Sequence, residues 1–367
     1  MDKYYYILDE IIKEELDAGN KIAIYPFGKI GMYAKAILED RYGQKGIFID
    51  NFLTKYNPEI IDMRSFAEKD YTNVTVILCA ADVNLNLSLL QQMTELCFGV
   101  KVRNILTPIE LMPPKAPLII QNDEKKDFFQ ELKNLCCVKK VIGYDLVRVG
   151  KNYDGGYVMI DDFSKKSIAY SFGISNDISW EEWVASRYID VYCYDHTIEG
   201  LPHRNEKLHW YKYGIAGTDR IEDSLLSMET LIEKNNHKAE TKMILKMDVE
   251  GAEWEFIKSA DSTLLDKFSQ MTFELHFITD ENHKEEIIAA LRKINKTHQA
   301  VWIHANNGGG AERAKNEIVP NLLEITYVNK KEYQFISAPY DCPIELDYPN
   351  KKMIYDIELK GWGEVNG

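Results

Sequence analysis

Long apolar runs, a signal-peptide core and paired cysteines are all missing from this sequence of 367 residues. A membrane-spanning helix needs roughly eighteen or more apolar residues in a row, and no segment comes near that length. The first residues begin an amphipathic pattern with charges at Asp2 and Lys3, unlike a signal peptide. The six cysteines are scattered without a Cys-x-x-Cys pair, which argues against a zinc site or a disulfide framework. These absences predict a cytoplasmic protein with reduced thiols and no membrane span.

An excess of positive charge is also missing. Lys and Arg number 44 and Asp and Glu number 58, which gives a net charge of −14. Proteins that bind nucleic acids or anionic membranes in general present a basic face, so we expect no nucleic acid among the partners. The chain is 45% apolar and 11% aromatic, which is typical of packed globular cores.

Four prolines gather in residues 107–118 and divide the sequence into two parts. Proline disfavours helix and central strand, so we place a domain boundary there, with domains over residues 1–115 and 116–367. In the first domain helical and strand patterns alternate, which predicts a small Rossmann-like βαβ sheet. The expected helices cover residues 5–16, 28–40 and 84–97, and the expected strands cover residues 21–25, 45–49, 74–79 and 102–106.

The second domain alternates in the same way. Its expected strands cover residues 167–172, 190–194, 207–213, 242–247 and 271–277, and its expected helices cover residues 178–188, 222–234, 254–259 and 282–294. Two further strands, 299–304 and 322–328, follow without a helix between them and should pair antiparallel at a sheet edge, across a long loop. We therefore expect an α/β fold with a seven-stranded sheet whose last strand is reversed.

Three carboxylates follow the apolar strand 242–247 within six residues, namely Asp248, Glu250 and Glu253. In open α/β sheets, ligands bind just beyond the carboxyl ends of the strands. The next strand carries Glu274 and His276, so we expect Asp248, Glu274 and His276 to form one catalytic polar cluster. Strand alternation places Thr272, Glu274 and His276 on one face and Phe273, Leu275 and Phe277 on the other.

His276 is the candidate general base, because a neutral imidazole is available near pH 7. Asp248 or Glu274 can orient His276 or hold a divalent cation that acidifies a hydroxyl, and the metal question stays open. The alternative is that His276 is a hydrogen-bonded strand histidine without a catalytic role.

Other strand ends carry features suited to a nucleoside. Gly173 follows the first strand and lets backbone approach a ligand beside a helix N-terminus. Asp195 closes the second strand, where an acidic residue can accept both ribose hydroxyls. Ile215 follows the third strand and can flank a flat ring. The alternatives are an ordinary turn at Gly173, a turn cap at Asp195 and a plain turn at Ile215.

Two glycine-rich loops are further candidates. In the first, Asp154, Gly155, Gly156 and Tyr157 can close over a cofactor, with Asp154 or Arg148 meeting its amino or carboxylate group; the alternative is a β-turn. In the second, residues 304–310, Asn306 and Asn307 offer donors and acceptors for sugar hydroxyls. The alternative for this loop is a flexible hairpin connection.

The first domain contains part of a dinucleotide fingerprint. Residues 26–31 match it except that Pro26 replaces its first glycine, and Asp50 lies near the expected acidic position. The proline weakens any NAD site, so we interpret this domain as a module for homo-oligomer formation or for the nucleotide of a substrate.

Several of these segments occur together in a familiar order. They are Asp154–Tyr157, Ser171–Asp177, Tyr194–Asp195, Gly214–Ile215 and Lys246–Glu253. The sequence over about residues 141–328 resembles the FkbM-type S-adenosylmethionine-dependent methyltransferases, which have the class I methyltransferase fold. The Asp-Val-Glu-Gly-Ala-Glu motif is the most specific part of the resemblance. One departure is Phe172–Asp177, where the family more often has a Gly-Ala-Asn form.

The resemblance implies O-methylation of a sugar, glycan precursor or similar small polar metabolite in glycan biosynthesis. It implies that Gly173 and Asp177 lie against the methionine part of the cofactor, that Ile174 also contacts the cofactor and that Asp195 holds the ribose. Asp248 would stand at the reaction centre, with Glu250 toward the substrate. One rival is a nucleotide-sugar or dinucleotide enzyme using the first domain, which lacks a complete fingerprint and a Tyr-x-x-x-Lys pair. The other rival is a non-catalytic binding protein.

Overall fold

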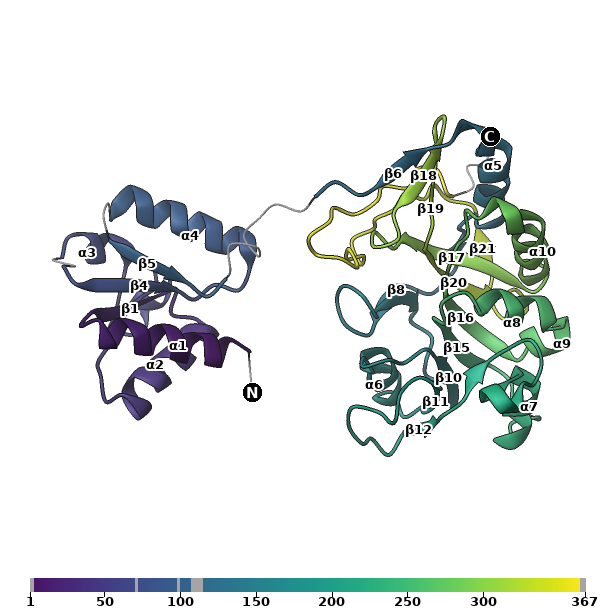
Figure 1. The fold of residues 1–367 in the computed structure, drawn as a ribbon, viewed down its shortest axis with the longest axis horizontal. Coiled ribbons are helices and arrows are strands. Elements are labelled where there is room, and N and C mark those ends of the chain that lie inside the picture. Colours follow the sequence, from purple (N-terminus) through teal and green to yellow (C-terminus); the bar gives the residue numbers. More distant parts are fainter. Residues whose placement is uncertain (1–2, 70–71, 98–99, 107–114, 364–367) are drawn as a thin grey trace. The chain divides into compact units, whose positions relative to one another are not determined.

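The computed structural model describes residues 3–69, 72–97, 100–106 and 115–363 (Figure 1). The chain divides into two compact units, Met1–Pro113 and Pro114–Gly367. Most of the proline-rich segment, residues 107–114, lies outside the described residues. Among the described residues, no helix has both the length and the apolar character to cross a membrane.

The N-terminal unit contains a parallel sheet of five strands in the order β3-β2-β1-β4-β5. The strands are β1 (Lys21–Tyr25), β2 (Ile47–Ile49), β3 (Ile60–Ile61), β4 (Val74–Leu78) and β5 (Lys101–Asn104). The helices are α1 (Lys3–Asp17), α2 (Lys29–Ala36), α3 (Met63–Ala67) and α4 (Val83–Leu96). The short elements β3 and α3 were not predicted, because they carry too few residues for a periodic signal.

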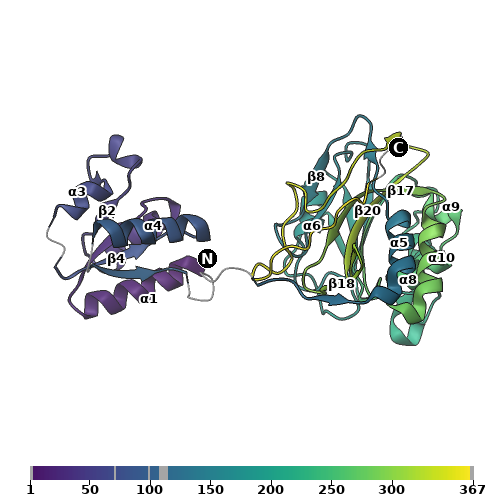
Figure 2. The ribbon, with the colours of Figure 1, turned by 90° about the horizontal axis from the view of Figure 1, so that it is seen from above.

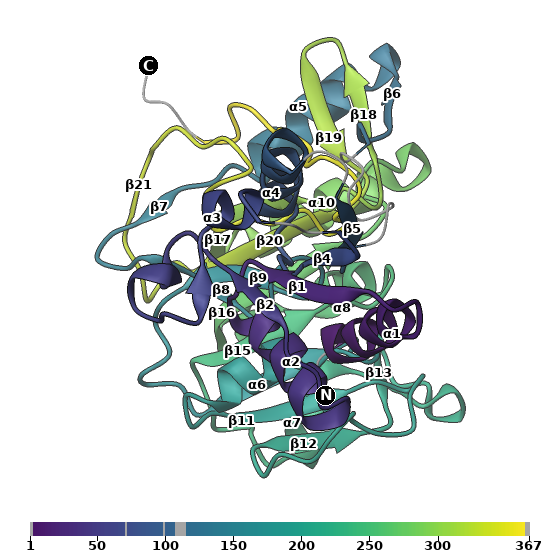
Figure 3. The same cartoon turned by 90° about the vertical axis from the view of Figure 1, so that its left-hand side faces the viewer.

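Helices cover both faces of this sheet (Figures 1 and 3). On one face, α1 buries Leu8, Ile11 and Ile12, which recur at helical spacing and pack with the core side of α2. On the other face, α3 and α4 contribute Met63, Phe66 and Met93 to a separate cluster. The two apolar layers explain why every residue of β4 is buried.

The C-terminal unit is built on a seven-stranded sheet with the order β12-β11-β10-β15-β16-β20-β17. Its strands are β10 (Ile168–Phe172), β11 (Asp190–Tyr194), β12 (Leu208–Tyr211), β15 (Met243–Met247), β16 (Phe268–Leu275), β17 (His298–Ala305) and β20 (Leu323–Asn329). The first five in the chain are parallel, whereas β20 runs antiparallel to both β16 and β17. The predicted α/β class and the antiparallel pairing of the last two strands are confirmed.

Helices pack on both faces of the large sheet (Figure 2). One face is covered by α5 (Lys126–Leu135), α7 (Met228–Lys234), α8 (Glu253–Ser259), α9 (Ser262–Leu265) and α10 (Lys284–Ile294). The other face carries α6 (Ser179–Ala185) and the hairpin of β8 (Leu146–Val149) and β9 (Tyr157–Ile160). The remaining strands are short: β6 (Ile119–Gln121), β7 (Lys140–Val141), β13 (Gly214–Ile215), β14 (Leu225–Leu226), β18 (Ala311–Ala314), β19 (Glu317–Pro320) and β21 (Phe335–Ile336).

Three expectations about this unit were wrong in detail. The loop between β17 and β20 contains the β18–β19 hairpin, which pairs with β6. The helix expected over residues 222–234 begins only at Met228, because Ser224 is left-handed with φ of 58° and Ser227 caps the shorter helix. The strand expected over residues 271–277 ends at Leu275, so the face assigned to Phe277 by alternation was wrong and its side chain is 51% exposed.

Candidate functional site

The turn after β10 requires a glycine. Gly173 has φ of +76°, and a Cβ atom on it would lie 1.6 Å from the carbonyl oxygen of Asp248. The Lys246 ammonium donates a hydrogen bond to the carbonyl of Gly173, and the Asp248 amide donates to the carbonyl of Phe172 at 3.1 Å. The ends of β10 and β15 are therefore held in close contact.

Asp195, which directly follows β11, holds this same turn. Its Oδ2 accepts from the amides of Ile174 at 3.0 Å and Ser175 at 2.8 Å, and its Oδ1 accepts from the amide and hydroxyl of Thr197. Burial raises the pKa of Asp195, but these hydrogen bonds outweigh burial and lower it overall. Because a carboxylate has about four acceptor positions, a ribose hydroxyl bound here would share them with the turn.

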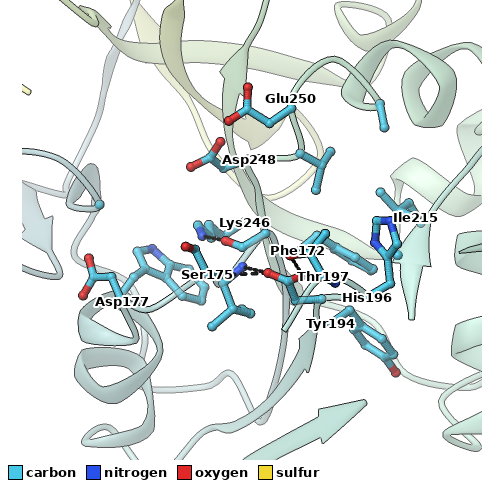
Figure 4. Close-up of a pocket in the computed structure, with 18 of the residues that line it drawn as sticks. Phe172, Ser175, Asp177, Tyr194, His196, Thr197, Ile215, Lys246, Asp248 and Glu250 are labelled. Carbon is cyan, nitrogen blue, oxygen red and sulfur yellow. Dashed lines mark hydrogen bonds between the residues drawn. The ribbon is translucent and has the colours of Figure 1, made fainter. Parts of the chain in front are cut away.

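A cavity of about 520 Å³ opens at the carboxyl ends of β10, β11 and β15 (Figure 4). Eight of the predicted cofactor residues line it: Asp154, Gly155, Gly173, Ile174, Asp177, Asp195, Ile215 and Asp248. The predicted residues Gly156 and Tyr157 are not among the described residues that line it. His196 and Thr197 also line the cavity and were missed, although they directly follow Asp195 in the sequence.

The charge of the lining is predominantly negative. Among the described residues, the wall contains six carboxyl side chains, from Asp154, Asp177, Glu181, Asp195, Asp248 and Glu250, and three basic side chains, from Lys151, Arg220 and Lys246. One end is apolar and aromatic, with Phe172, Tyr194, Ile215 and Leu225. Such a cavity favours a ligand with positive charge and a flat apolar part.

The loop before β9 folds against this cavity. A Cβ atom on Gly155 would lie 2.2 Å from a carboxylate oxygen of Asp177, and Lys151 forms an ion pair of 2.8 Å with the same oxygen. Arg148 donates to the carbonyls of Lys151 at 2.9 Å and Tyr153 at 2.7 Å. Arg148 therefore shapes the loop in this structure, and only Asp154 of the two predicted ligand contacts lies in the cavity wall.

Glu253, the last residue of the acidic motif, holds the turn that follows Asp248. Its carboxylate accepts from the amides of Val249 at 2.8 Å and Gly251 at 2.9 Å, and the side chain is fully buried. The turn is tight, with φ of 55° at Glu250 and 110° at Gly251. Glu250 consequently points outward with its side chain 86% exposed.

The predicted cluster of Asp248, Glu274 and His276 is brought together. One ligand atom from each residue lies within 4.8 Å of the other two. The Tyr157 hydroxyl donates to Asp248 at 3.1 Å, and burial together with Asp248 raises the pKa of this phenol well above its usual value. Asp248 and Glu250 line the cavity, whereas Glu274 and His276 lie behind it with exposures of 5% and 3%.

His276 is oriented by two glutamates. Its Nδ1 lies 3.1 Å from a carboxylate oxygen of Glu253, and its Nε2 lies 3.2 Å from the carboxylate of Glu250. Burial lowers the pKa of His276, but the hydrogen bond to Glu253 and the nearby carboxylates outweigh burial and raise it overall. Burial and the neighbouring charges of Asp248 and Glu324 raise the pKa of Glu274 well above its usual value.

A row of ionisable side chains continues across the sheet behind the cluster. Glu274 on β16 lies opposite Glu324 on β20, which lies opposite His304 on β17. His304 contacts Glu324 at 2.9 Å through Nδ1 and Asp356 at 3.0 Å through Nε2. Burial lowers the pKa of His304, but these two carboxylates raise it to about 10. His304 is therefore a buried cation, and nothing in the local sequence pattern indicated this.

Asn306 and Asn307, the predicted substrate residues, have partners within the chain. The Asn306 amide donates to Glu274, and its oxygen accepts from the amide of Gly308 at 2.8 Å. The Asn307 side chain donates to the carbonyl of Ile354 at 2.8 Å and accepts from the amide of Lys351 at 2.8 Å. Neither residue is among those that line the cavity. In this structure Asn306 holds Glu274 of the cluster, and Asn307 holds residues 351–354 of the C-terminal segment that follows β21.

Two groups of side chains among the described residues have the spacing of metal ligands. One is Asp248 with Glu274 and His276, which contains the oxygen ligands that Mg²⁺ prefers. The other is His304 with Cys342 and Asp347. Both nitrogens of His304 are engaged with carboxylates, and a protonated imidazole has no free lone pair, so the second group does not fit a metal ion.

Comparison with known proteins supports a methyltransferase. Residues 143–298 match the family model described as the methyltransferase FkbM domain, which confirms the resemblance predicted from the motifs. None of the curated proteins matches the chain. Among solved structures, a methyltransferase FkbM from Methylobacillus flagellatus KT is similar at 12% identity and a TM-score of 0.33, over 89% of this chain and 98% of that chain.

Proposed function

We propose that this protein is an S-adenosylmethionine-dependent O-methyltransferase that acts on a sugar, a glycan precursor or a similar small polar metabolite. The observation that carries the proposal is the acidic cavity at the strand ends, with six carboxyl side chains against three basic ones among the described residues. S-adenosylmethionine contains a sulfonium and an ammonium, whereas dinucleotides and nucleotide sugars contain phosphates. A wall rich in carboxylates favours the first and repels the second.

The residues present fit this cofactor. The apolar end, with Phe172, Tyr194 and Ile215, suits the adenine ring. Asp195 lines the cavity and can accept a ribose hydroxyl, and Gly173, which also lines it, presents backbone without a Cβ atom to the methionine part. S-adenosylmethionine supplies an electrophilic methyl group when bound, and the chain has to position and deprotonate the acceptor hydroxyl.

We infer the roles of the cluster from its geometry. Asp248 and Glu250 line the cavity and can accept a hydrogen bond from the acceptor hydroxyl. His276 accepts the proton at Nε2, because its Nδ1 is already engaged by Glu253. Glu250 contacts Nε2 and also lines the cavity, so it connects His276 to the acceptor hydroxyl. Burial and the charges of Asp248 and Glu324 raise the pKa of Glu274, which favours its neutral form beside Asp248. Proton transfer of this kind typically contributes about 10²–10⁴-fold to the rate.

A carbohydrate acceptor suits the surface beside the cluster. Phe277 directly follows His276, has φ of 55° and keeps a half-exposed ring against Gly251. Bulky residues adopt this conformation rarely, and such strain is more common at functional sites. An exposed ring packed against Gly251, which directly follows Glu250 in the chain, offers an apolar face to a sugar, and the exposed Glu250 carboxylate offers a hydroxyl acceptor.

Isothermal titration calorimetry tests the cofactor class. The full-length protein is expected to bind S-adenosylmethionine and S-adenosylhomocysteine, and to bind neither NAD nor a nucleotide sugar in the same cavity. Binding of NAD or a nucleotide sugar alone would favour the rival in which the N-terminal unit does the chemistry. Absence of binding for all of these ligands would support the non-catalytic rival.

The substitution Asp195→Ala is expected to weaken S-adenosylmethionine binding by about 1.5–3 kcal/mol, the range for hydrogen bonds to a charged partner. The loss combines the ribose contact with release of the Ile174–Ser175 turn. Asp190→Ala is a matched control, since Asp190 lies at the other end of β11 and pairs with Lys207 and His209. Unchanged affinity in a folded Asp195 variant would place the cofactor elsewhere.

We propose that the N-terminal unit is dispensable for cofactor binding and serves oligomer formation or a substrate nucleotide. The expected result is that a chain beginning at Pro114, where the second compact unit starts, binds S-adenosylmethionine as the full-length protein does. The shortened chain has to keep Lys115 and β6, because the backbone of Lys115 forms hydrogen bonds with Met353 and Tyr355 and β6 pairs with β18. Loss of calorimetric binding in a shortened chain with an intact circular dichroism spectrum would contradict the proposal.

A further inference from the structure

One wall of the cavity contains a buried carboxylate in which one of the two oxygens lacks a hydrogen-bond donor. Glu181 lies on α6, is fully buried, and belongs to the residues that line the cavity. Its Oε1 accepts a hydrogen bond from the hydroxyl of Ser171, but its Oε2 has no hydrogen-bond partner among the described residues. A buried carboxylate oxygen without a donor is costly, so a missing partner is to be expected there.

The basic side chain nearest to Glu181 does not fill this role. The Lys246 ammonium lies 3.8 Å from Oε1, the oxygen already bonded to Ser171, and it donates to the carbonyl of Gly173 instead. Lys246 thereby connects Glu181 to the Gly173 turn, which also lines the cavity. Oε2 is left for a donor from outside the chain.

Trp180, the residue before Glu181, contributes an unpaired hydrogen-bond donor. The indole Nε1 of Trp180 is also buried without a hydrogen-bond partner among the described residues, and Trp180 lines the same cavity. One wall therefore presents an unpaired acceptor and an unpaired donor on consecutive residues. An α-amino acid group, with its ammonium and its carboxylate, is the complement of such a pair.

We infer that the Glu181 carboxylate binds the α-ammonium of the methionine portion of the cofactor through Oε2. The inference rests on the proposed use of S-adenosylmethionine and assigns its amino-acid end to Glu181, beside the Gly173 turn. Burial raises the pKa of Glu181 and Lys246 counteracts this, so a bound ammonium would further favour the ionised carboxylate.

The test compares two ligands that differ only at the amino-acid end. S-adenosylhomocysteine has the α-amino acid group, whereas 5′-methylthioadenosine keeps the adenosine and the thioether without it. In calorimetry with the full-length protein, Glu181→Gln is expected to weaken S-adenosylhomocysteine binding by about 10–100-fold, as for other hydrogen bonds between charged groups. Its affinity for 5′-methylthioadenosine should stay within about 2-fold, because this ligand makes no such bond.

The neighbouring residue provides a matched control. Glu182 lies on the same helix, is 41% exposed at its side chain and pairs with His203. Glu182→Gln is expected to change neither affinity. Thermal melting of each variant shows that it is folded. A second measurement needs no variant: the unsubstituted protein should bind an S-adenosylhomocysteine analogue that lacks only the α-amino group about 10–100-fold more weakly.

Each outcome decides a different point. Equal losses for both ligands in Glu181→Gln would mean that Glu181 maintains the cavity as a whole, which overturns the inference. Unchanged affinity for S-adenosylhomocysteine, or equal binding of the deaminated analogue, would overturn it as well. If the unsubstituted protein binds none of these ligands, the proposed cofactor itself is wrong.

Discussion

Replacing His276 with alanine is expected to lower turnover by about 10²–10⁴-fold, the usual contribution of a general base. Affinity for S-adenosylmethionine should change little, because His276 lies behind the cavity and acts in the transition state. The measurement is kcat with a methyl acceptor together with calorimetry of the cofactor. His209→Ala is the control, since His209 is a histidine of β12 that pairs with Asp190.

The pH dependence of kcat gives an independent check on His276. Its pKa is raised above 6.5 by Glu253 and the neighbouring carboxylates, and a protonated imidazole cannot accept a proton. Turnover of the unsubstituted enzyme should therefore rise with pH through an inflection above 6.5, and His276→Ala should lose that inflection. A variant that keeps full turnover and the same inflection would exclude His276 as the base.

Activation by a metal ion predicts a different pattern. If Asp248 and Glu274 hold a divalent cation, a chelator abolishes turnover and Asp248→Asn is more damaging than His276→Ala. If chelator has no effect and both variants remain fully active, positioning of the two substrates is the only source of rate.

Replacing His304 with glutamine is expected to destabilise the C-terminal unit by about 3–5 kcal/mol at neutral pH, because it removes a buried cation between two carboxylates. Glu324 is almost fully buried and would lose the counter-charge at Nδ1, and Asp356 would lose its partner at Nε2. All six tryptophans follow residue 114 in the sequence, so tryptophan fluorescence in urea reports on this unit alone.

The sign of the pH effect distinguishes His304 from an ordinary packing residue. Its folded pKa is raised from 6.5 to about 10, so its stabilisation is fully present below pH 6.5 and is lost as the pH rises toward 10. His298 provides the opposite case, because burial lowers its pKa to about 4 and its contribution is lost as the pH falls from 6.5. If the His304 variant and the unsubstituted protein lose the same stability between pH 6.5 and pH 10, His304 is not the buried cation described above.

Local patterns predicted the elements that bring the site together. The strands 168–172, 190–194 and 243–247 were expected within one residue, because buried parallel strands read as short apolar runs. The positions of Gly173, Asp195 and Asp248 at strand ends followed from those boundaries. Phe277 was misassigned because alternation holds only within a strand, and β16 ends two residues earlier.

By itself the sequence determined which residues end strands and which chemistry they carry, because these depend on neighbours in the chain. The tertiary structure decided which of them share a wall of the cavity. Glu181 reaches Ser171 and Lys246 because β10 and β15 are adjacent, and His304 meets Asp356 across 52 residues of sequence. Strand order and the path of the C-terminal segment create these contacts, and both arise from packing between distant segments that local periodicity does not contain.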